Sequence, residues 1–183
     1  MLDLNPMLCR QVREPFDRPG WIFEVKWDGF RTIAEVDGDG VRLYSRRLNS
    51  FNGRFSQIAK SLEGLGHNAI LDGEIVALDE EGHPRFEWLF HRGKDGKGQL
   101  VYFVFDLLYL DGNDLRREPL HRRKSRLKRI IRKIPHLVYV DHIERARQRT
   151  LCSCFKAWPG RNRGEGQAKS LCGRKRDAGL AED

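Results

Sequence analysis

The sequence of 183 residues lacks long apolar runs and contains few cysteines. No segment approaches the roughly 20 consecutive apolar residues that span a bilayer, so we expect no contact with a membrane. No apolar run follows a basic start at the N-terminus, which argues against secretion. We therefore expect a cytoplasmic protein whose 4 cysteines are reduced rather than joined in disulfides. The length suits one domain with a real core and is too short for two large domains.

Charge is plentiful but unevenly distributed. The chain carries a net charge of +8. Residues 1–144 contain 24 Lys and Arg against 22 Asp and Glu, a net of +2, whereas residues 145–183 contain 10 against 4, a net of +6. A basic excess suits a partner with phosphate groups but says nothing about the fold. The tail also holds Cys152, Cys154 and Cys172, and such a shift usually marks a linker, a binding arm or a disordered end.

Hydrophobic periodicity and turn residues predict more strands than helices. Strands are expected at residues 21–25, 32–36, 41–44, 69–78 and 100–110, and helices at residues 54–62 and 120–134. A turn rich in glycine and aspartate at residues 37–40 joins two of these strands as a hairpin. We therefore predict an α+β fold of mostly antiparallel sheets with flanking helices.

The helix expected at residues 120–134 is amphipathic. Its apolar face carries Leu127, Ile130, Ile131 and Ile134 at helical spacing. Many Lys and Arg residues occupy the remainder of the helix. We interpret them as a solvated outer face in preference to a DNA contact.

The residues that suggest chemistry begin at Lys26. It opens the sequence Lys-Trp-Asp-Gly-Phe-Arg directly after a predicted strand. A lysine amine becomes nucleophilic when desolvation or a neighbouring cation lowers its pKa. Asp28 and Arg31 would place polar groups near the same phosphate or sugar. Taken alone, the hexapeptide is explained equally well by a turn at Asp28 and Gly29 with a surface ion pair.

Three further segments favour a chemical role. They are Ser-Arg-Arg-Leu-Asn at residues 45–49, Leu-Asp-Gly-Glu-Ile-Val at residues 71–76 and Phe-Val-Phe-Asp-Leu-Leu-Tyr-Leu-Asp-Gly at residues 103–112. With the hexapeptide, in this order, they resemble the motifs of the covalent nucleotidyltransferases, which are DNA ligases, RNA ligases and mRNA capping enzymes. The last segment and the lead-in at residues 14–24 are most similar to bacterial ATP-dependent DNA ligases, above all the small ligases and the ligase module of end-joining proteins.

The resemblance implies a role for each principal residue. Lys26 would become covalently attached to AMP, and Arg46 would contact the nucleotide and the DNA end. Glu74 would hold the ribose or a metal ion. Phe105 would stack on adenine, although Phe103 lies on the same strand face and could be confused with it.

The resemblance also implies supporting residues, cofactors and partners. Glu24 and Arg31 would contact ATP or AMP, and Asp28, Gly29 and Asp72 would support the pocket. The implied cofactors are ATP and Mg²⁺. The implied partner is nicked or broken double-stranded DNA, and the oligomeric state stays open.

The implied reaction proceeds through three phosphoryl transfers. Lys26 attacks the α-phosphate of ATP while magnesium neutralises the departing pyrophosphate. AMP then passes to the 5′-phosphate at a nick, and the 3′-hydroxyl finally displaces AMP and seals the strand. The protein would supply positioning and charge, with Arg31 and Arg46 as phosphate clamps. Such a reaction serves DNA repair, recombination and replication.

The resemblance ends near Glu144. We therefore expect an incomplete adenylation domain at residues 1–144 and a basic, cysteine-containing tail at residues 145–183. The family would next supply a Leu-Glu-Gly-Ile-Val-Ala-Lys segment, a motif ending in Trp-Leu-Lys and an OB-fold, and the 183-residue sequence has none of them. We hypothesise a change of reading frame between residues 144 and 151. The genetic code allows codons for residues 157–183 that encode both missing motifs, in order, when the first base is dropped and the frame shifts.

The frame hypothesis predicts a disordered tail and a weakly stable body, because the sheets would lack strands they need. Two other interpretations of the tail stay open. It could be a basic arm that binds DNA, or Cys152, Cys154 and Cys172 could bind zinc. A structural zinc site normally needs four ligands, and cysteine pairs spaced Cys-x-x-Cys are commoner than Cys-x-Cys, which disfavours zinc.

Two alternative functions also stay open. The first is an RNA ligase or capping-type enzyme, against which the segment at residues 105–112 argues. The second is a non-catalytic remnant that binds DNA through the basic helix and tail. Such a remnant would bind DNA in a salt-sensitive manner without forming an AMP adduct.

We predict that this chain does not seal nicked duplex DNA, because the family's second lysine, its metal-binding glutamate and its OB-fold are not encoded in frame. A sealing assay with ATP and magnesium measures this, and a sealed product would contradict it. Sequencing the gene tests the frame hypothesis directly. Codons at residues 157–169 that are incompatible with Leu-Glu-Gly-Ile-Val-Ala-Lys in the shifted frame would end it.

Overall fold

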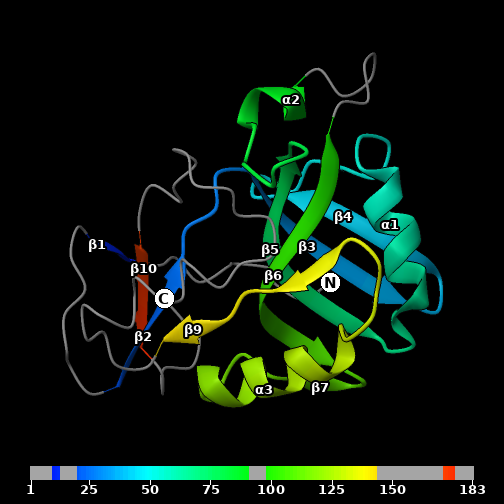
Figure 1. The fold of residues 1–183 in the computed structure, drawn as a ribbon. Coiled ribbons are helices and arrows are strands. Elements are labelled where there is room, and N and C mark those ends of the chain that lie inside the picture. Colours follow the sequence, from blue (N-terminus) through cyan, green and yellow to red (C-terminus); the bar gives the residue numbers. More distant parts are fainter. Residues whose placement is uncertain (1–9, 13–19, 91–97, 144–170, 176–183) are drawn as a thin grey trace.

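The computed structural model describes residues 10–12, 20–90, 98–143 and 171–175 (Figure 1). Within these residues the fold combines two mostly antiparallel sheets with short helices, as predicted for an α+β domain. In the described part of the chain, no helix has the length and apolar character needed to cross a membrane.

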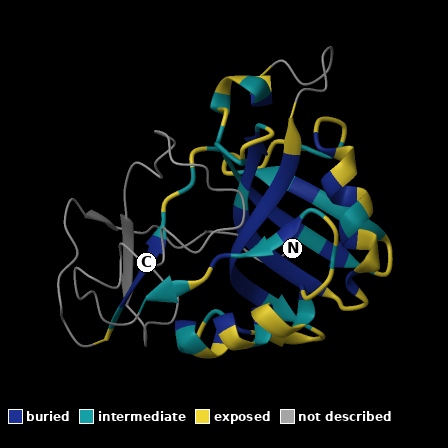
Figure 2. Ribbon diagram, in the orientation of Figure 1, coloured by how far each residue is buried: buried dark blue, intermediate teal, exposed yellow. Residues whose placement is uncertain are grey.

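The larger sheet contains the centre of the molecule. Its main path is β4 (Gly40–Ser45), β3 (Phe30–Asp37), β5 (Ala69–Leu78), β6 (Gln99–Leu110) and β7 (Asn113–Asp114), and β8 (Leu137–Tyr139) pairs in parallel with another part of β6. Nearly every residue of β5 and β6 is buried, as the dark blue strands in Figure 2 show. The strands predicted at residues 69–78 and 100–110 are confirmed, the second with one additional residue.

The predicted hairpin is confirmed as β3 and β4. These strands pair in antiparallel register up to Asp37 and Gly40. The backbone N–H of Asp39 donates to Oδ1 of Asp37 at 3.0 Å, and Gly40 has a φ of +126°. Glycine adopts this backbone conformation without the steric penalty that a side chain would bring, so the turn matches its sequence.

The smaller sheet includes a strand from the tail. Its order is β1 (Arg10–Val12), β10 (Leu171–Lys175), β2 (Trp21–Val25) and β9 (His142–Ile143). Residues 171–175 of the tail form this strand, and the disorder expected of residues 145–183 stays a prediction. A strand edge such as that of β2 offers unpaired N–H and C=O groups, and any extended backbone can satisfy them. The rest of the tail lies outside the described residues, so the boundary near residue 144 and the change of frame stay predictions.

The helices lie against the larger sheet. α1 (Ser56–Leu62) continues into a 3-10 turn at Glu63–Leu65 and buries Ile58 and Leu62. This agrees with the helix predicted at residues 54–62. The short α2 (Phe86–Phe90) was not predicted, since five residues carry too little periodicity to be recognised.

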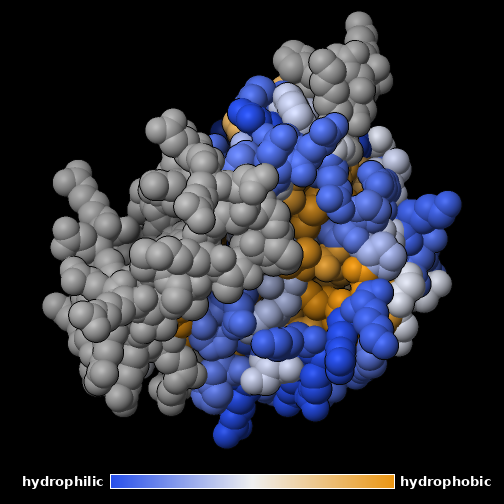
Figure 3. Space-filling model, in the orientation of Figure 1, coloured by the Kyte–Doolittle hydropathy of each residue, from blue (hydrophilic) through white to orange (hydrophobic). Residues whose placement is uncertain are grey.

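α3 (Leu120–Ile130) is shorter than predicted. The expected helix continued to residue 134, but Lys133 has a φ of +70° and Pro135 disfavours helical backbone in the residue before it. The buried face of α3 includes Leu120 and Leu127. Hydrophilic side chains cover the lower edge of the molecule in Figure 3, where Figure 1 places α3, which fits the predicted solvated face.

The pairing of β5 with β6 is irregular near its middle. Asp72 pairs with Asp106, whereas the next residue, Gly73, pairs with Val104. β6 therefore contains an extra residue at this place, and that residue is Phe105. An extra residue in one strand bends it and re-aims its side chains, so the bulge decides where the Phe105 ring lies.

Gly73 sits at the tightest point of this pairing. A Cβ atom at Gly73 would lie 2.5 Å from the carbonyl oxygen of Phe103 and 2.5 Å from Cε2 of Tyr102. Neither atom can move away easily, because Tyr102 is fully buried and its hydroxyl donates to the carbonyl oxygen of Thr32 at 2.8 Å. Close packing of the two strands therefore requires glycine here.

We predict that Gly73→Ala lowers the free energy of unfolding by about 1–3 kcal/mol, because the added methyl group overpacks the buried interface. Urea unfolding followed by circular dichroism measures this change. Gly64→Ala is the matched control, since a Cβ at Gly64 has no atom within 4 Å. An equal effect of the two substitutions would contradict the prediction.

Candidate functional site

Lys26 lies where the chain leaves one sheet for the other. It directly follows β2 and is exposed, as is Asp28 in the same segment. The chain then crosses to β3 in the larger sheet. A Cβ at Gly29 would meet the carbonyl oxygen of Ile75 and would lie 3.0 Å from Cγ of Glu74. Glycine thus allows the segment after Lys26 to lie directly on the strand that carries Glu74.

Arg31 and Asp72 form a two-point ion pair between β3 and β5. Nε and Nη2 of Arg31 donate to the two carboxylate oxygens of Asp72, each at 2.5 Å. Asp72 is fully buried, and the Arg31 side chain is 18% exposed. The Arg31 guanidinium also lies over the Phe105 ring, with Cζ 4.5 Å from the ring centroid. This fork geometry holds the guanidinium in one orientation, beside the aromatic residue expected to bind adenine.

Glu74 lies beside this ion pair, because it is the register partner of Arg31. Burial raises the pKa of the Glu74 carboxyl to about 7. The positive charges of Arg31 and Lys26 act in the opposite direction, and the negative charge of Asp72 raises the pKa further. The carboxyl is therefore close to half-protonated near neutral pH.

The setting of Glu74 fits the magnesium ion implied by the sequence. Mg²⁺ is usually held by one or two carboxylates together with phosphate oxygens of a substrate. Glu74 offers one carboxylate that interacts with Lys26 and Arg31. A bound cation would favour the charged form of Glu74, which burial disfavours.

The aromatic residues of β6 have different partners. Phe103 is fully buried and stacks on Trp27, with ring centroids 3.7 Å apart and an interplanar angle of 10°. Phe105 is 8% exposed and lies under Arg31. Both belong to one apolar cluster, as expected for residues on the same strand face. Because Trp27 lies against Phe103, Phe105 is the better candidate for stacking with a nucleotide base.

Glu24 points toward the interior. It is 3% exposed, and one of its carboxylate oxygens, Oε1, accepts a hydrogen bond from Nζ of Lys124 at 2.5 Å. Its expected contact with ATP or AMP stays a prediction. Lys124 was not recognised from the sequence as part of this region, because it lies inside the basic run of α3.

Arg46 follows β4 directly, and the last residue of that strand, Ser45, pairs with Thr32 of β3. Residues 45–49 form a turn after β4, in which the backbone N–H groups of Leu48 and Asn49 donate to Ser45 at 2.8 and 3.0 Å. Arg46 and Arg47 are exposed there, and Leu48 is 56% exposed with a φ of +60°. An exposed basic turn suits a charged partner, so a contact of Arg46 with the DNA end stays a prediction.

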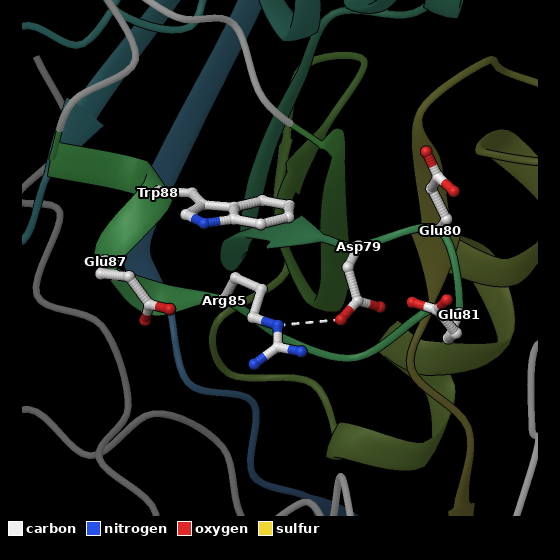
Figure 4. Close-up of a pocket in the computed structure, with 6 residues that line it drawn as sticks. All are labelled: Asp79, Glu80, Glu81, Arg85, Glu87 and Trp88. Atoms are coloured by element: carbon white, nitrogen blue, oxygen red, sulfur yellow. Dashed lines mark hydrogen bonds and ion pairs between the residues drawn. The ribbon is translucent and has the colours of Figure 1, made fainter.

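A hollow lies beside the segment that runs from the end of β5 into α2. It has a volume of about 350 Å³, and Figure 4 shows its lining, which consists of Asp79, Glu80, Glu81, Arg85, Glu87 and Trp88. Nε of Arg85 donates to Oδ2 of Asp79 at 2.8 Å. Asp79, Glu81 and His83 could each direct one ligand atom to a cation, with these atoms within 4.8 Å of one another. None of the residues expected from the sequence lines this hollow.

Comparison with protein families places the chain among DNA-joining enzymes. The family model described as "ATP dependent DNA ligase domain" matches residues 6–158. The chain is 38% identical over 130 residues to the multifunctional non-homologous end joining protein LigD of Pseudomonas aeruginosa, and this match covers 70% of the chain but 15% of that protein. It is 30% identical over 140 residues to the SPbeta prophage-derived DNA ligase-like protein LigB of Bacillus subtilis, covering 75% of the chain and 51% of that protein.

A solved structure also resembles the whole described fold. Mycobacterial DNA ligase D complexed with ATP and MES has a TM-score of 0.75 and 30% identity, covering 96% of this chain and 55% of that chain. The chain thus spans between 15% and 55% of the length of these three relatives.

We predict that Glu74 makes the stability of the protein fall as the pH rises from about 4.5 to about 7. Its folded pKa is raised, so the folded state binds the proton more tightly than the unfolded state does. The stabilisation that Glu74 contributes is fully present below pH 4.5 and is lost as the pH rises through about 7. A shift of this size corresponds to on the order of 3 kcal/mol.

Urea unfolding of the parent and of Glu74→Gln across this pH window measures the contribution. The substitution should flatten the curve, whereas Glu87→Gln on the exposed side of α2 should leave the slope unchanged. Parallel curves for the parent and Glu74→Gln would show that Glu74 does not titrate in this window.

Proposed function

Because this chain belongs to the ATP-dependent DNA ligase family, we propose that Lys26 attacks the α-phosphate of ATP and forms a lysyl-AMP intermediate. The bond from Lys26 Nζ to phosphorus forms as the bond between the α-phosphorus and the bridging oxygen breaks. Pyrophosphate takes the electron pair and departs. The amine must give up a proton to attack, so the reaction needs Lys26 in its uncharged form.

One observation carries this proposal, which is the grouping of Lys26 with the Arg31–Asp72 pair, Glu74 and Phe105. Glu74 interacts electrostatically with both Lys26 and Arg31, and Arg31 lies over Phe105. Apart from Lys26, which follows β2, these residues come from three strands, and the whole group comes from three of the four sequence motifs. An ordinary ion pair on the surface would not bring together a lysine, a held guanidinium, a carboxylate and an aromatic face.

Each residue has a role that follows from its setting. Arg31 is held by Asp72, so it can contact the sugar or phosphate without a large loss of side-chain freedom. Phe105 already accepts a flat cation on its ring face, and an adenine ring requires the same kind of surface. Glu74 would hold magnesium, which when bound supplies positive charge to the phosphates of ATP.

We further propose that nicked or broken duplex DNA is the acceptor of AMP and that the activity serves DNA repair. The relative from P. aeruginosa is named as a non-homologous end joining protein, and the mycobacterial relative was solved with ATP. On this proposal Arg46, in its exposed turn, contacts the DNA end. Roles in recombination and replication would use the same chemistry.

We predict that incubation with ATP labelled at the α-phosphate and magnesium gives a protein adduct, and that ATP labelled at the γ-phosphate gives none. Lys26→Ala should abolish the adduct because it removes the nucleophile. Lys60→Ala is the matched control, since Lys60 is an exposed lysine in the last turn of α1. Denaturing gel electrophoresis with mass spectrometry of the labelled peptide measures the adduct in the parent, in Lys26→Ala and in Lys60→Ala.

The acceptor is tested by adding nicked DNA or nicked RNA to the isolated adduct. Transfer of AMP to the 5′-phosphate of DNA supports the proposal, and transfer only to RNA would favour an RNA ligase or capping-type enzyme. A parent protein that forms no adduct, yet binds DNA as well as Lys26→Ala does, would instead identify a non-catalytic DNA-binding remnant.

A further inference from the structure

Two cations on α3 are fully buried, although the sequence predicts a solvated basic helix. Arg123 and Lys124 both have 0% exposed surface. A buried charge is tolerated only where partners satisfy its hydrogen bonds. The partners therefore show what each cation holds in place.

Lys124 connects three separate parts of the fold. Its Nζ donates to Oε1 of Glu24 at 2.5 Å, to the carbonyl oxygen of Phe105 at 3.1 Å and to the carbonyl oxygen of Val140 at 3.0 Å. An ammonium group has three N–H donors, and all three are used. The acceptors belong to β2, to β6 and to the segment between β8 and β9.

This connection crosses between the two sheets. β2 pairs with β9 and β10, both of which belong to the smaller sheet. Phe105 belongs to the larger sheet. Lys124 is therefore a buried polar link between the strand that ends just before Lys26 and the strand that carries the proposed adenine platform.

A second contact fixes the other side of Lys26. Trp27 stacks on Phe103, which is also on β6. Lys26 is thus flanked by Glu24, held through Lys124, and by Trp27, held by stacking. Both attachments lead to the same strand, so β6 sets the position of the lysine relative to the base.

We propose that Lys124 is a positioning residue, which holds the strand before Lys26 against β6 and so aligns the amine with the bound nucleotide. This inference rests on the proposed function, because alignment matters only if Lys26 attacks ATP. Lys124 has no exposed surface, so it would act through Glu24 and not by contact with the nucleotide. A displacement of about 1 Å of a reacting group can slow a reaction roughly 100-fold.

Arg123 provides a matched control on the same helix. Its Nε and Nη2 donate to the carboxylate of Asp106 at 2.9 and 3.0 Å, and Nη1 donates to the carbonyl oxygen of Glu118. These acceptors lie on β6 and in the segment before α3, and neither is on β2. Lys124→Met and Arg123→Met therefore both remove a buried cation, but only the first removes the link to β2.

The first measurement is the rate constant of lysyl-AMP formation at saturating ATP, corrected for the folded fraction, together with the KM for ATP. We expect Lys124→Met to lower the rate constant about 10- to 100-fold with a smaller change in KM. Arg123→Met should leave the corrected rate close to that of the parent. Equal corrected rates for Lys124→Met and Arg123→Met would overturn the proposal.

The second measurement does not depend on catalysis. Amide hydrogen exchange followed by mass spectrometry should show lost protection at residues 21–29 in Lys124→Met, with residues 100–107 less affected. Arg123→Met should show the opposite pattern. The double variant Glu24→Gln/Lys124→Met leaves neither Glu24 nor Lys124 as an unpaired buried charge. It therefore replaces Lys124→Met in the exchange measurement if that single variant does not fold. Unchanged protection of residues 21–29 would overturn the proposal, whereas a parent without any adduct but with the expected exchange pattern would refute the proposed function alone.

Discussion

The pairing of β5 with β6 is the constraint on which the rest of the structure depends. These are the two longest strands, and both are buried along nearly their whole length. β5 carries Asp72 and Glu74 toward β3, and β6 carries Phe105 to the same region. Every other element of the larger sheet is added to this pair on one side or the other. The candidate site is therefore built on strands that buried packing holds in place.

Among the described residues, the buried charges of Glu24, Asp72, Asp106, Arg123 and Lys124 each join separate elements. Asp72 holds Arg31, Asp106 holds Arg123, and Glu24 holds Lys124. Removing one partner from such a pair leaves an uncompensated charge, whereas the complete pair contributes little net stability. These pairs therefore mainly fix how neighbouring elements are aligned and how their side chains are oriented. In this chain they connect β3 to β5, α3 to β6 and α3 to β2.

Much of the fold was predictable because its signals are local. The hairpin of β3 and β4 follows from its turn residues, and the bounds of β5 follow from an apolar run between turns. The candidate site residues around Lys26 were proposed because their motifs occur in one order along the chain, and their roles stay predictions.

The remainder depends on contacts between distant residues. Glu24 and Lys124 are 100 positions apart, and nothing near either of them indicates a partner. β10 pairs with β2 through backbone groups, which carry no sequence signal. The end of α3 was predicted too late because the isoleucines that follow continue the apolar pattern although the backbone has already left the helix. Local pattern thus predicts elements better than it predicts which elements meet.

The extra residue in β6 has a consequence for how this protein could evolve. A regular ladder would pair every backbone group of β5 and β6, and it would shift each residue after Val104 by one position relative to β5. Mutations that regularise the ladder would therefore be favoured by stability, and under the proposed function they would be opposed by the loss of nucleotide binding. Selection for thermal stability alone should erode the bulge first, because it is where the needs of folding and of catalysis diverge.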